Sequence, residues 1–70
     1  MEWLGKAQIT EMYGDKPSTV SKYRAEMEKS GLFDNCILPG KNLRIRSDAY
    51  AYFRAHKKEI RKGLPVARFA

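Results

Sequence analysis

Apolar residues recur at helical spacing near the start of the chain. Residues 5–13 place Ile9, Met12 and Tyr13 at positions i, i+3 and i+4, which predicts a short helix. Gly14 follows directly, and a glycine in this place typically ends a helix in the left-handed conformation. We therefore expect the first helix to end at Gly14.

A second helix is predicted from Pro17 to about Lys29. Proline suits the first helical turn, and Asp15 or Lys16 before it serves as the cap. Gly31 marks the end of this helix. On a wheel of about 100° per residue, three apolar residues form its buried stripe: Val20, Tyr23 and Met27. Because only about four residues separate the two helices, they must cross steeply, as in a helix-turn-helix.

The pattern then changes to the alternation typical of strands. Residues 36–38 are apolar, and in residues 43–46 the apolar Leu43 and Ile45 alternate with arginines. Residues 39–42 contain the turn pair Pro-Gly, so the two runs predict a two-stranded β-hairpin with one wet, basic face. We call residues 36–46 the wing.

A third helix is predicted over residues 47–62. Ser47 is its expected cap, and Asp48 lies in the first turn, where an anion suits the helix dipole. Gly63 and Pro65 end the helix. Its apolar stripe is Ala49, Tyr52, Phe53, His56 and Ile60, and the opposite side carries Arg54, Lys58, Arg61 and Lys62.

These elements predict an α+β fold that is mostly helical. Its architecture would be a winged helix-turn-helix, with three helices and a two-stranded wing between the second and the third. A chain of 70 residues forms one small domain and has no room for a large enclosed cavity. We expect residues 1–62 to form that domain and residues 63–70 to form a mobile C-terminal tail that the fold does not need.

Positive charge is concentrated in the second part of the chain. The whole chain has 14 Lys and Arg against 8 Asp and Glu, for a net charge of +6. Residues 1–40 hold five bases and six acids, for −1, whereas residues 41–70 hold nine bases and two acids, for +7. Such a balance favours a polyanionic partner, and a solvated surface that keeps a small protein soluble is the alternative interpretation.

The predicted outer side of the second helix is rich in small and basic residues. Opposite the buried stripe lie Ser18, Ser21, Lys22, Ala25 and Lys29, with no carboxylate among them. Small side chains let a helix enter the major groove, about 12 Å wide, while lysines and serines meet bases or phosphates. The predicted DNA-binding residues of this helix are Lys16, Ser18, Thr19, Ser21, Lys22 and Arg24, of which Arg24 is expected to contact phosphate. An ordinary solvent-facing stripe is the alternative.

The wing supplies a second predicted DNA contact. Lys41 and Asn42 lie in its turn, and Arg44 and Arg46 lie on its exposed strand face. Basic side chains held on a hairpin can follow the backbone or enter a minor groove.

In this order of elements, residues 4–53 resemble the excisionase family of small winged-helix DNA-binding proteins, related in fold to the mercury-resistance-type regulators. The resemblance rests on Leu4, Ile9 to Gly14, Ser18-Thr19-Val20 with Lys22, Ser30-Gly31, and the run from Leu38 to Phe53. It implies an accessory factor of a phage or mobile element that binds and bends attachment-site DNA and directs an integrase towards excision. Gln8, Thr10 and Asp15 depart from the family's usual residues.

Three residues of the tail are predicted to bind a protein partner. Leu64, Val66 and Phe69 are exposed apolar candidates in a segment too short to fold alone. The partner would be an integrase of the tyrosine recombinase type, or copies of the protein itself on DNA.

The sequence offers no constellation for catalysis. It has no nucleophile–base pair, no paired carboxylates, no phosphate-cradling glycine loop and no metal-binding cluster, so we expect no enzyme, no cofactor, no metal and no small-molecule substrate. His56 and Cys36 are expected to be structural residues. The single cysteine and the lack of a long apolar run favour the cytoplasm, without a membrane partner. The resemblance to excisionases of phages implies that this is the cytoplasm of a bacterial host cell.

The expected function is therefore sequence-specific binding of double-stranded DNA in the manner of an excisionase. One alternative is a small phage transcriptional repressor or switch protein of the same fold. Another is a protein-binding antirepressor that acts through the third helix and the tail.

Overall fold

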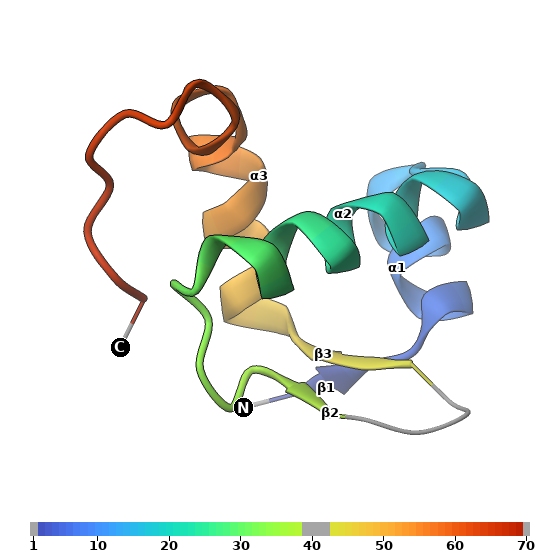
Figure 1. Cartoon of the computed structure of the whole chain (residues 1–70). Helices are drawn as coiled ribbons and strands as arrows, with labels where there is room; N and C mark the ends of the chain where they lie inside the picture. Colours follow the sequence, from blue (N-terminus) through green and yellow to red (C-terminus); the bar gives the residue numbers. More distant parts are fainter. Residues whose placement is uncertain (1, 39–42, 70) are drawn as a thin grey trace.

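Three helices lie on one side of a small antiparallel sheet (Figure 1). The computed structural model describes residues 2–38 and 43–69. The elements are β1 (Trp3–Leu4), α1 (Lys6–Tyr13), α2 (Pro17–Ser30), β2 (Ile37–Leu38), β3 (Arg44–Arg46) and α3 (Ser47–Lys62). The predicted α+β, mostly helical fold class is confirmed at this level.

The sheet has three strands rather than the two predicted. Its order is β1-β3-β2, with Leu4 and Ile37 both paired to Ile45 of the central strand. The prediction missed β1 because a strand of two residues has no alternation to detect, and its pairing with β3 defines it. The predicted turn, residues 39–42, lies outside the described residues.

The helix ends follow local sequence signals closely. Gly14 and Gly31 adopt φ angles of 74° and 72°, so both end their helices in the left-handed conformation as predicted. Lys16 caps α2 and Pro17 occupies its first turn. At α3 the prediction is off by one residue: Ser47 is the first helical residue and Arg46 occupies the cap position.

Eleven buried side chains form the core between the helices and the sheet. They are Leu4, Ile9, Val20, Tyr23, Met27, Phe33, Cys36, Ile45, Ala49, Tyr50 and Phe53. The predicted stripe of α2 is confirmed. In α3 the buried side is rotated from the predicted one, because Tyr50 is fully buried whereas Tyr52, His56 and Ile60 are only half-buried.

Tyr50 accounts for this rotation. Its hydroxyl donates a hydrogen bond of 2.7 Å to the Asp15 carboxylate, and Arg54 pairs with the same carboxylate at 3.3 Å. Burial and the nearby carboxylate raise the pKa of the Tyr50 hydroxyl. A phenol with a buried hydrogen-bond partner can occupy a core position, so Asp15 ties the turn between α1 and α2 to α3.

Besides Asp15, Gln8 and Thr10 differ from the usual residues of the excisionase family, and the two have different surroundings. Gln8 accepts a hydrogen bond of 2.8 Å from the backbone N–H of Gly5 and so satisfies a donor at the start of α1. The Thr10 hydroxyl is buried without a hydrogen-bond partner in the part of the chain that the structure describes.

The C-terminal segment, residues 64–69, folds back over the end of the core. The Phe69 ring packs against Phe33 and Tyr52, with centroids 6.0 and 5.3 Å apart, and the backbone N–H of Phe69 donates to the Leu32 carbonyl at 3.1 Å. Arg68 pairs with Asp34. Phe69 is partly buried and packs against the core, and the expectation that the fold does not need this segment stays a prediction. Mobility of the segment stays a prediction.

Candidate nucleic-acid interface

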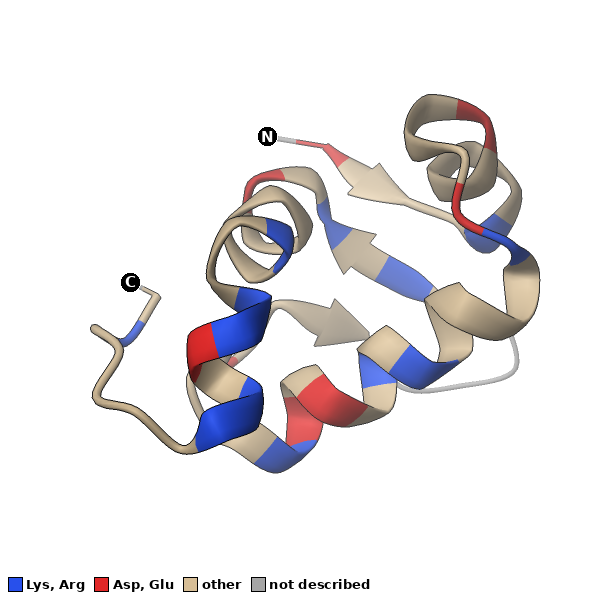
Figure 2. Ribbon diagram, turned by 90° about the horizontal axis from the view of Figure 1, so that it is seen from above, with Lys and Arg blue, Asp and Glu red and all other residues tan. Residues whose placement is uncertain are grey.

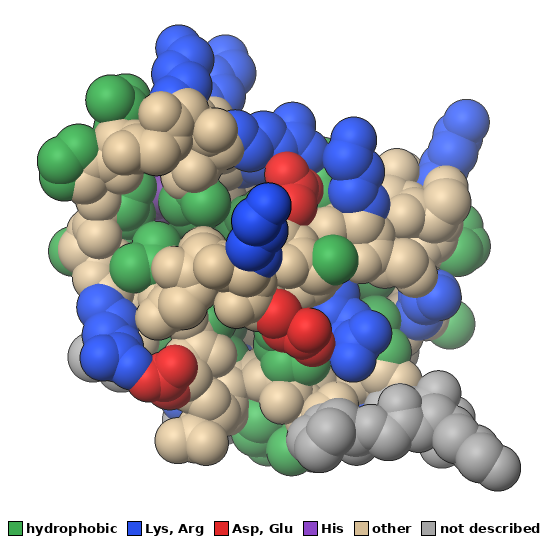
Figure 3. Space-filling model, in the orientation of Figure 1, with side chains coloured by type: hydrophobic (Ala, Val, Ile, Leu, Met, Phe, Trp, Pro, Cys, Tyr) green, Lys and Arg blue, Asp and Glu red, His purple; other side chains and the backbone are tan. Residues whose placement is uncertain are grey.

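The outer face of α2 has the composition that the sequence predicts. Ser18, Ser21, Lys22, Ala25 and Lys29 are all exposed, while Val20, Tyr23 and Met27 on the opposite side are buried. Seen in the orientation of Figure 1, basic side chains are spread over this side of the molecule, with acidic side chains between them (Figure 3). Three of these five side chains are small, as a helix that enters a groove requires.

The remaining predicted DNA-binding residues, Lys16, Thr19 and Arg24, differ in how exposed their side chains are. Lys16 is exposed at the cap, whereas Thr19 is half-buried. Arg24 forms an ion pair of 3.2 Å with Glu28, and its Nε is buried without a partner among the described residues. The Arg24 guanidinium therefore lies at the edge of the outer face and not on it.

The strand residues of the predicted wing are not equivalent. Lys41 and Asn42 lie outside the described residues. Arg44 is exposed, and its guanidinium lies so close to Gly5 that a Cβ atom there would collide with it. Gly5 therefore leaves the space in which the Arg44 side chain extends along the start of α1.

Arg46 is held by its neighbours instead of being presented freely. Its guanidinium donates to both Asp48 carboxylate oxygens, at 3.2 and 2.8 Å, and stands 5.5 Å from the centre of the Phe69 ring. Only 18% of the Arg46 side chain is exposed. This hydrogen bonding holds the pKa of Asp48 below its usual range. Of the two predicted wing arginines that the structure describes, Arg44 is the one open to a partner.

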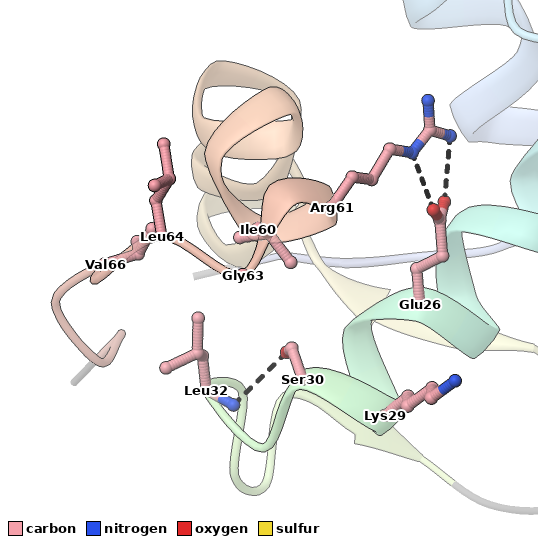
Figure 4. Close-up of a pocket in the computed structure, with 9 residues that line it drawn as sticks. All are labelled: Glu26, Lys29, Ser30, Leu32, Ile60, Arg61, Gly63, Leu64 and Val66. Atoms are coloured by element: carbon pink, nitrogen blue, oxygen red, sulfur yellow. Dashed lines mark hydrogen bonds and ion pairs between the residues drawn. The ribbon is translucent and has the colours of Figure 1, made fainter.

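The three predicted tail residues separate into two groups. Leu64 is 52% exposed and Val66 is half-buried, and both line a groove of about 590 Å³ at the C-terminal ends of α2 and α3. Figure 4 shows them opposite Leu32, with the paired Glu26 and Arg61 at the other end of the groove. Phe69 is half-buried against the core and not among the residues that line the groove, so the expectation that it is exposed is corrected, while its role in partner binding stays a prediction.

Two basic side chains of α3 contact α2, and neither was among the DNA-binding residues predicted from the sequence. Lys57 Nζ donates to the Tyr23 hydroxyl at 2.8 Å, and Arg61 donates to both carboxylate oxygens of Glu26 at 2.6 and 3.0 Å. Figure 2 shows Lys and Arg positions along both α2 and α3, with Asp and Glu positions between them. The spacing of four between Lys57 and Arg61, which places both on one side of α3, is the sequence signal that points to this surface.

Cys36 and His56 both have intramolecular hydrogen-bond partners. Cys36 is buried, which raises the pKa of its thiol, and the Sγ atom lies 3.3 Å from the Asp34 carbonyl oxygen. His56 Nδ1 lies 3.0 Å from the Tyr52 carbonyl oxygen. Within residues 2–38 and 43–69, no three His, Cys, Asp or Glu side chains gather as metal ligands would.

None of the helices in the described ranges combines the length and the apolar character needed to cross a membrane.

Comparison with models of known protein families, with curated proteins and with solved structures finds no match to this chain.

Proposed function

We propose that this protein binds double-stranded DNA through the outer face of α2. The observation that carries the proposal is the contrast between the two sides of this helix: the outer side presents small residues and lysines, with the exposed Glu28 at its edge, and the inner side buries Val20, Tyr23 and Met27. Small residues allow close approach to base edges, while lysines neutralise phosphates on the groove walls.

The proposed architecture is a winged helix-turn-helix. Its support is the order of the elements: residues 14–16 join α1 to α2, and the antiparallel strands β2 and β3 lie between α2 and α3. In this arrangement α2 is the recognition helix, and Arg44 contacts the DNA backbone beside it. Lys22 meets a base edge or a phosphate, and Ser18 and Ser21 bond to bases or backbone.

The biological role that we propose is that of an excisionase. The protein would bind and bend attachment-site DNA and direct a tyrosine-recombinase integrase towards excision, together with further copies of itself. The support is the resemblance of residues 4–53, above all the run from Leu38 to Phe53. A transcriptional repressor with the same fold would use the same α2 face on an operator.

The salt dependence of DNA binding tests the proposal. If α2 and the wing neutralise about five phosphates, the logarithm of affinity falls with the logarithm of salt concentration with a slope of roughly −4 to −5. Fluorescence anisotropy with a labelled duplex measures it. A slope near zero would show that DNA is not the principal partner.

A matched pair of variants locates the interface. Ala25→Glu adds bulk and negative charge at the centre of the outer face, so it should reduce affinity at least about tenfold, because a carboxylate there opposes the phosphates. Ala55→Glu makes the same change at an exposed position of α3 on the side away from the core, and should change affinity far less. Equal losses would assign the effect to net charge alone.

A protein-binding role is the second candidate, and the groove between α2, α3 and the C-terminal segment favours it. Its apolar wall consists of Leu32, Ile60, Leu64 and Val66. An antirepressor that used this groove would bind its partner in the absence of DNA and would tolerate Ala25→Glu.

A further inference from the structure

The line of contact between α2 and α3 brings together three cations and a tyrosine hydroxyl. We call this surface the seam and define it as Lys22, Tyr23 and Glu26 of α2 with Lys57 and Arg61 of α3. Lys57 and Arg61 both lie over the Tyr23 ring, 4.9 and 5.6 Å from its centre. The two helices therefore meet over an aromatic ring that orients the basic side chains of Lys57 and Arg61.

The one carboxylate of the seam is neutralised within it. Arg61 donates two hydrogen bonds to Glu26, and this bonding is the main reason why the pKa of Glu26 lies below its ordinary value. Lys22 precedes Glu26 by four residues, so the two lie on the same side of α2, and the charges of Lys22 and Lys57 lower the pKa of Glu26 further. After the Glu26–Arg61 pair is discounted, the positive charges of Lys22 and Lys57 remain.

Hydrogen-bond donors of the seam are left for an outside acceptor. The Lys57 ammonium has three N–H groups and gives one to the Tyr23 hydroxyl. That hydroxyl accepts from Lys57, and its own proton has no acceptor among the described residues. A ligand that complements this set is an anion with several oxygen atoms.

We propose that the seam binds a phosphate group of the DNA backbone, with Lys57 as the central contact and Lys22 beside it. The inference rests on the proposed function, because Lys22 belongs both to the seam and to the outer face of α2. A strand whose bases face α2 then carries its backbone across to α3. Since Tyr23 already holds Lys57 in place, binding costs less side-chain entropy than binding by a free lysine.

Two neighbouring lysines of α3 provide the test. Lys57→Gln should weaken binding to a labelled duplex about 5- to 20-fold and make the salt slope shallower by about one, the effect of one lost phosphate contact. Lys58→Gln removes the same charge from the next, exposed position of α3, which is not part of the seam, and should change affinity less than about twofold. Equal effects of the two substitutions would overturn the proposal.

A variant without a charge change checks the role of the tyrosine. Tyr23→Phe keeps the ring but removes the hydroxyl, so binding should weaken a few-fold, and together with Lys57→Gln it should add little more. Full additivity of the two changes would mean that Tyr23 does not act with Lys57. Thermal unfolding of each variant shows that the fold is retained.

The source of the phosphate is tested directly. Inorganic phosphate titrated to about 10 mM, at constant ionic strength, should shift the Lys57 amide resonance little and should not displace duplex DNA. Strong binding of inorganic phosphate would identify the seam as a site for a small anion and overturn the assignment to DNA. If Ala25→Glu abolishes DNA binding while Lys57→Gln and Lys58→Gln behave alike, the seam fails and the proposed function stands. If no duplex binds the unmodified protein, the proposed function itself fails.

Discussion

The two halves of α3 are held to the molecule by different forces. In residues 47–54, Ala49, Tyr50 and Phe53 are fully buried in the core. In residues 55–62 no side chain is fully buried: Ile60 packs against the core while only half-buried, and Lys57 and Arg61 make polar contacts with α2. Burial of apolar surface contributes far more to stability than exposed ion pairs do. The first half therefore secures the fold, while the second half can present cations at little cost to stability.

A cavity in the first half should have the largest effect. Phe53 is fully buried and its ring contacts the rings of Tyr23 and Phe33, at centroid distances of 5.3 and 6.1 Å. Phe53→Ala should lower the free energy of unfolding by about 3–5 kcal/mol, which is a large share of the stability of so small a domain. Urea denaturation followed by circular dichroism measures it. A loss below about 1 kcal/mol would mean that the first half does not secure the fold.

An intermediate effect is expected from the C-terminal segment that packs beside α3. Phe69 is half-buried and contacts Tyr52 and Phe33, so Phe69→Ala should lower the free energy of unfolding by about 1–2 kcal/mol. Leu64→Ala, in the same segment but at an exposed position, should cost much less. If the two substitutions cost the same small amount, the segment does not contribute to the fold and the sequence-based expectation of a separate tail stands.

Local signals in the sequence predicted where the helices end. Contacts between residues distant in the sequence decide which side of α3 is buried, and the sequence did not predict them. Gly14, Pro17 and Gly31 set the helix ends through their own backbone preferences, which do not depend on the rest of the fold. The burial of Tyr50 depends on Asp15, which lies 35 residues away, and no helical wheel contains that contact.

The candidate site divides in the same way. The periodicity of α2 alone was enough to predict which of its residues are exposed, including Lys22 and Lys29. The packing of separate segments decides the other contacts: Arg46 is held by Asp48 and Phe69, and Lys57 bonds to Tyr23. Charge counts treat all arginines and lysines alike, whereas packing decides which of them face a partner.

The smallest effect is expected from the ion pair between Glu26 and Arg61, which joins the second half of α3 to α2. It appears as a change in how stability depends on pH. The pKa of Glu26 in the folded protein lies below its ordinary value of 4.5, mainly because Arg61 donates hydrogen bonds to the ionised carboxylate. A lowered folded-state pKa contributes stability that is present above the unfolded-state value and is lost as the pH falls through the folded-state value. The contribution of Glu26 is therefore complete at neutral pH and is lost progressively as the pH falls below the ordinary value of 4.5.

Glu26→Gln removes this titration while keeping the size of the side chain. Between about pH 6 and about pH 3, the melting temperature of this variant should fall less than that of the unmodified protein, and the two curves should converge at the acid end. Glu59→Gln, which removes an exposed carboxylate from the second half of α3, is the control for net charge. Because the Glu26–Arg61 pair lies at the surface, about 0.2 M salt should reduce the difference. If Glu26→Gln and Glu59→Gln give the same curves at low salt, the pair contributes nothing measurable, and the second half of α3 is held by Lys57, Tyr23 and Ile60 alone.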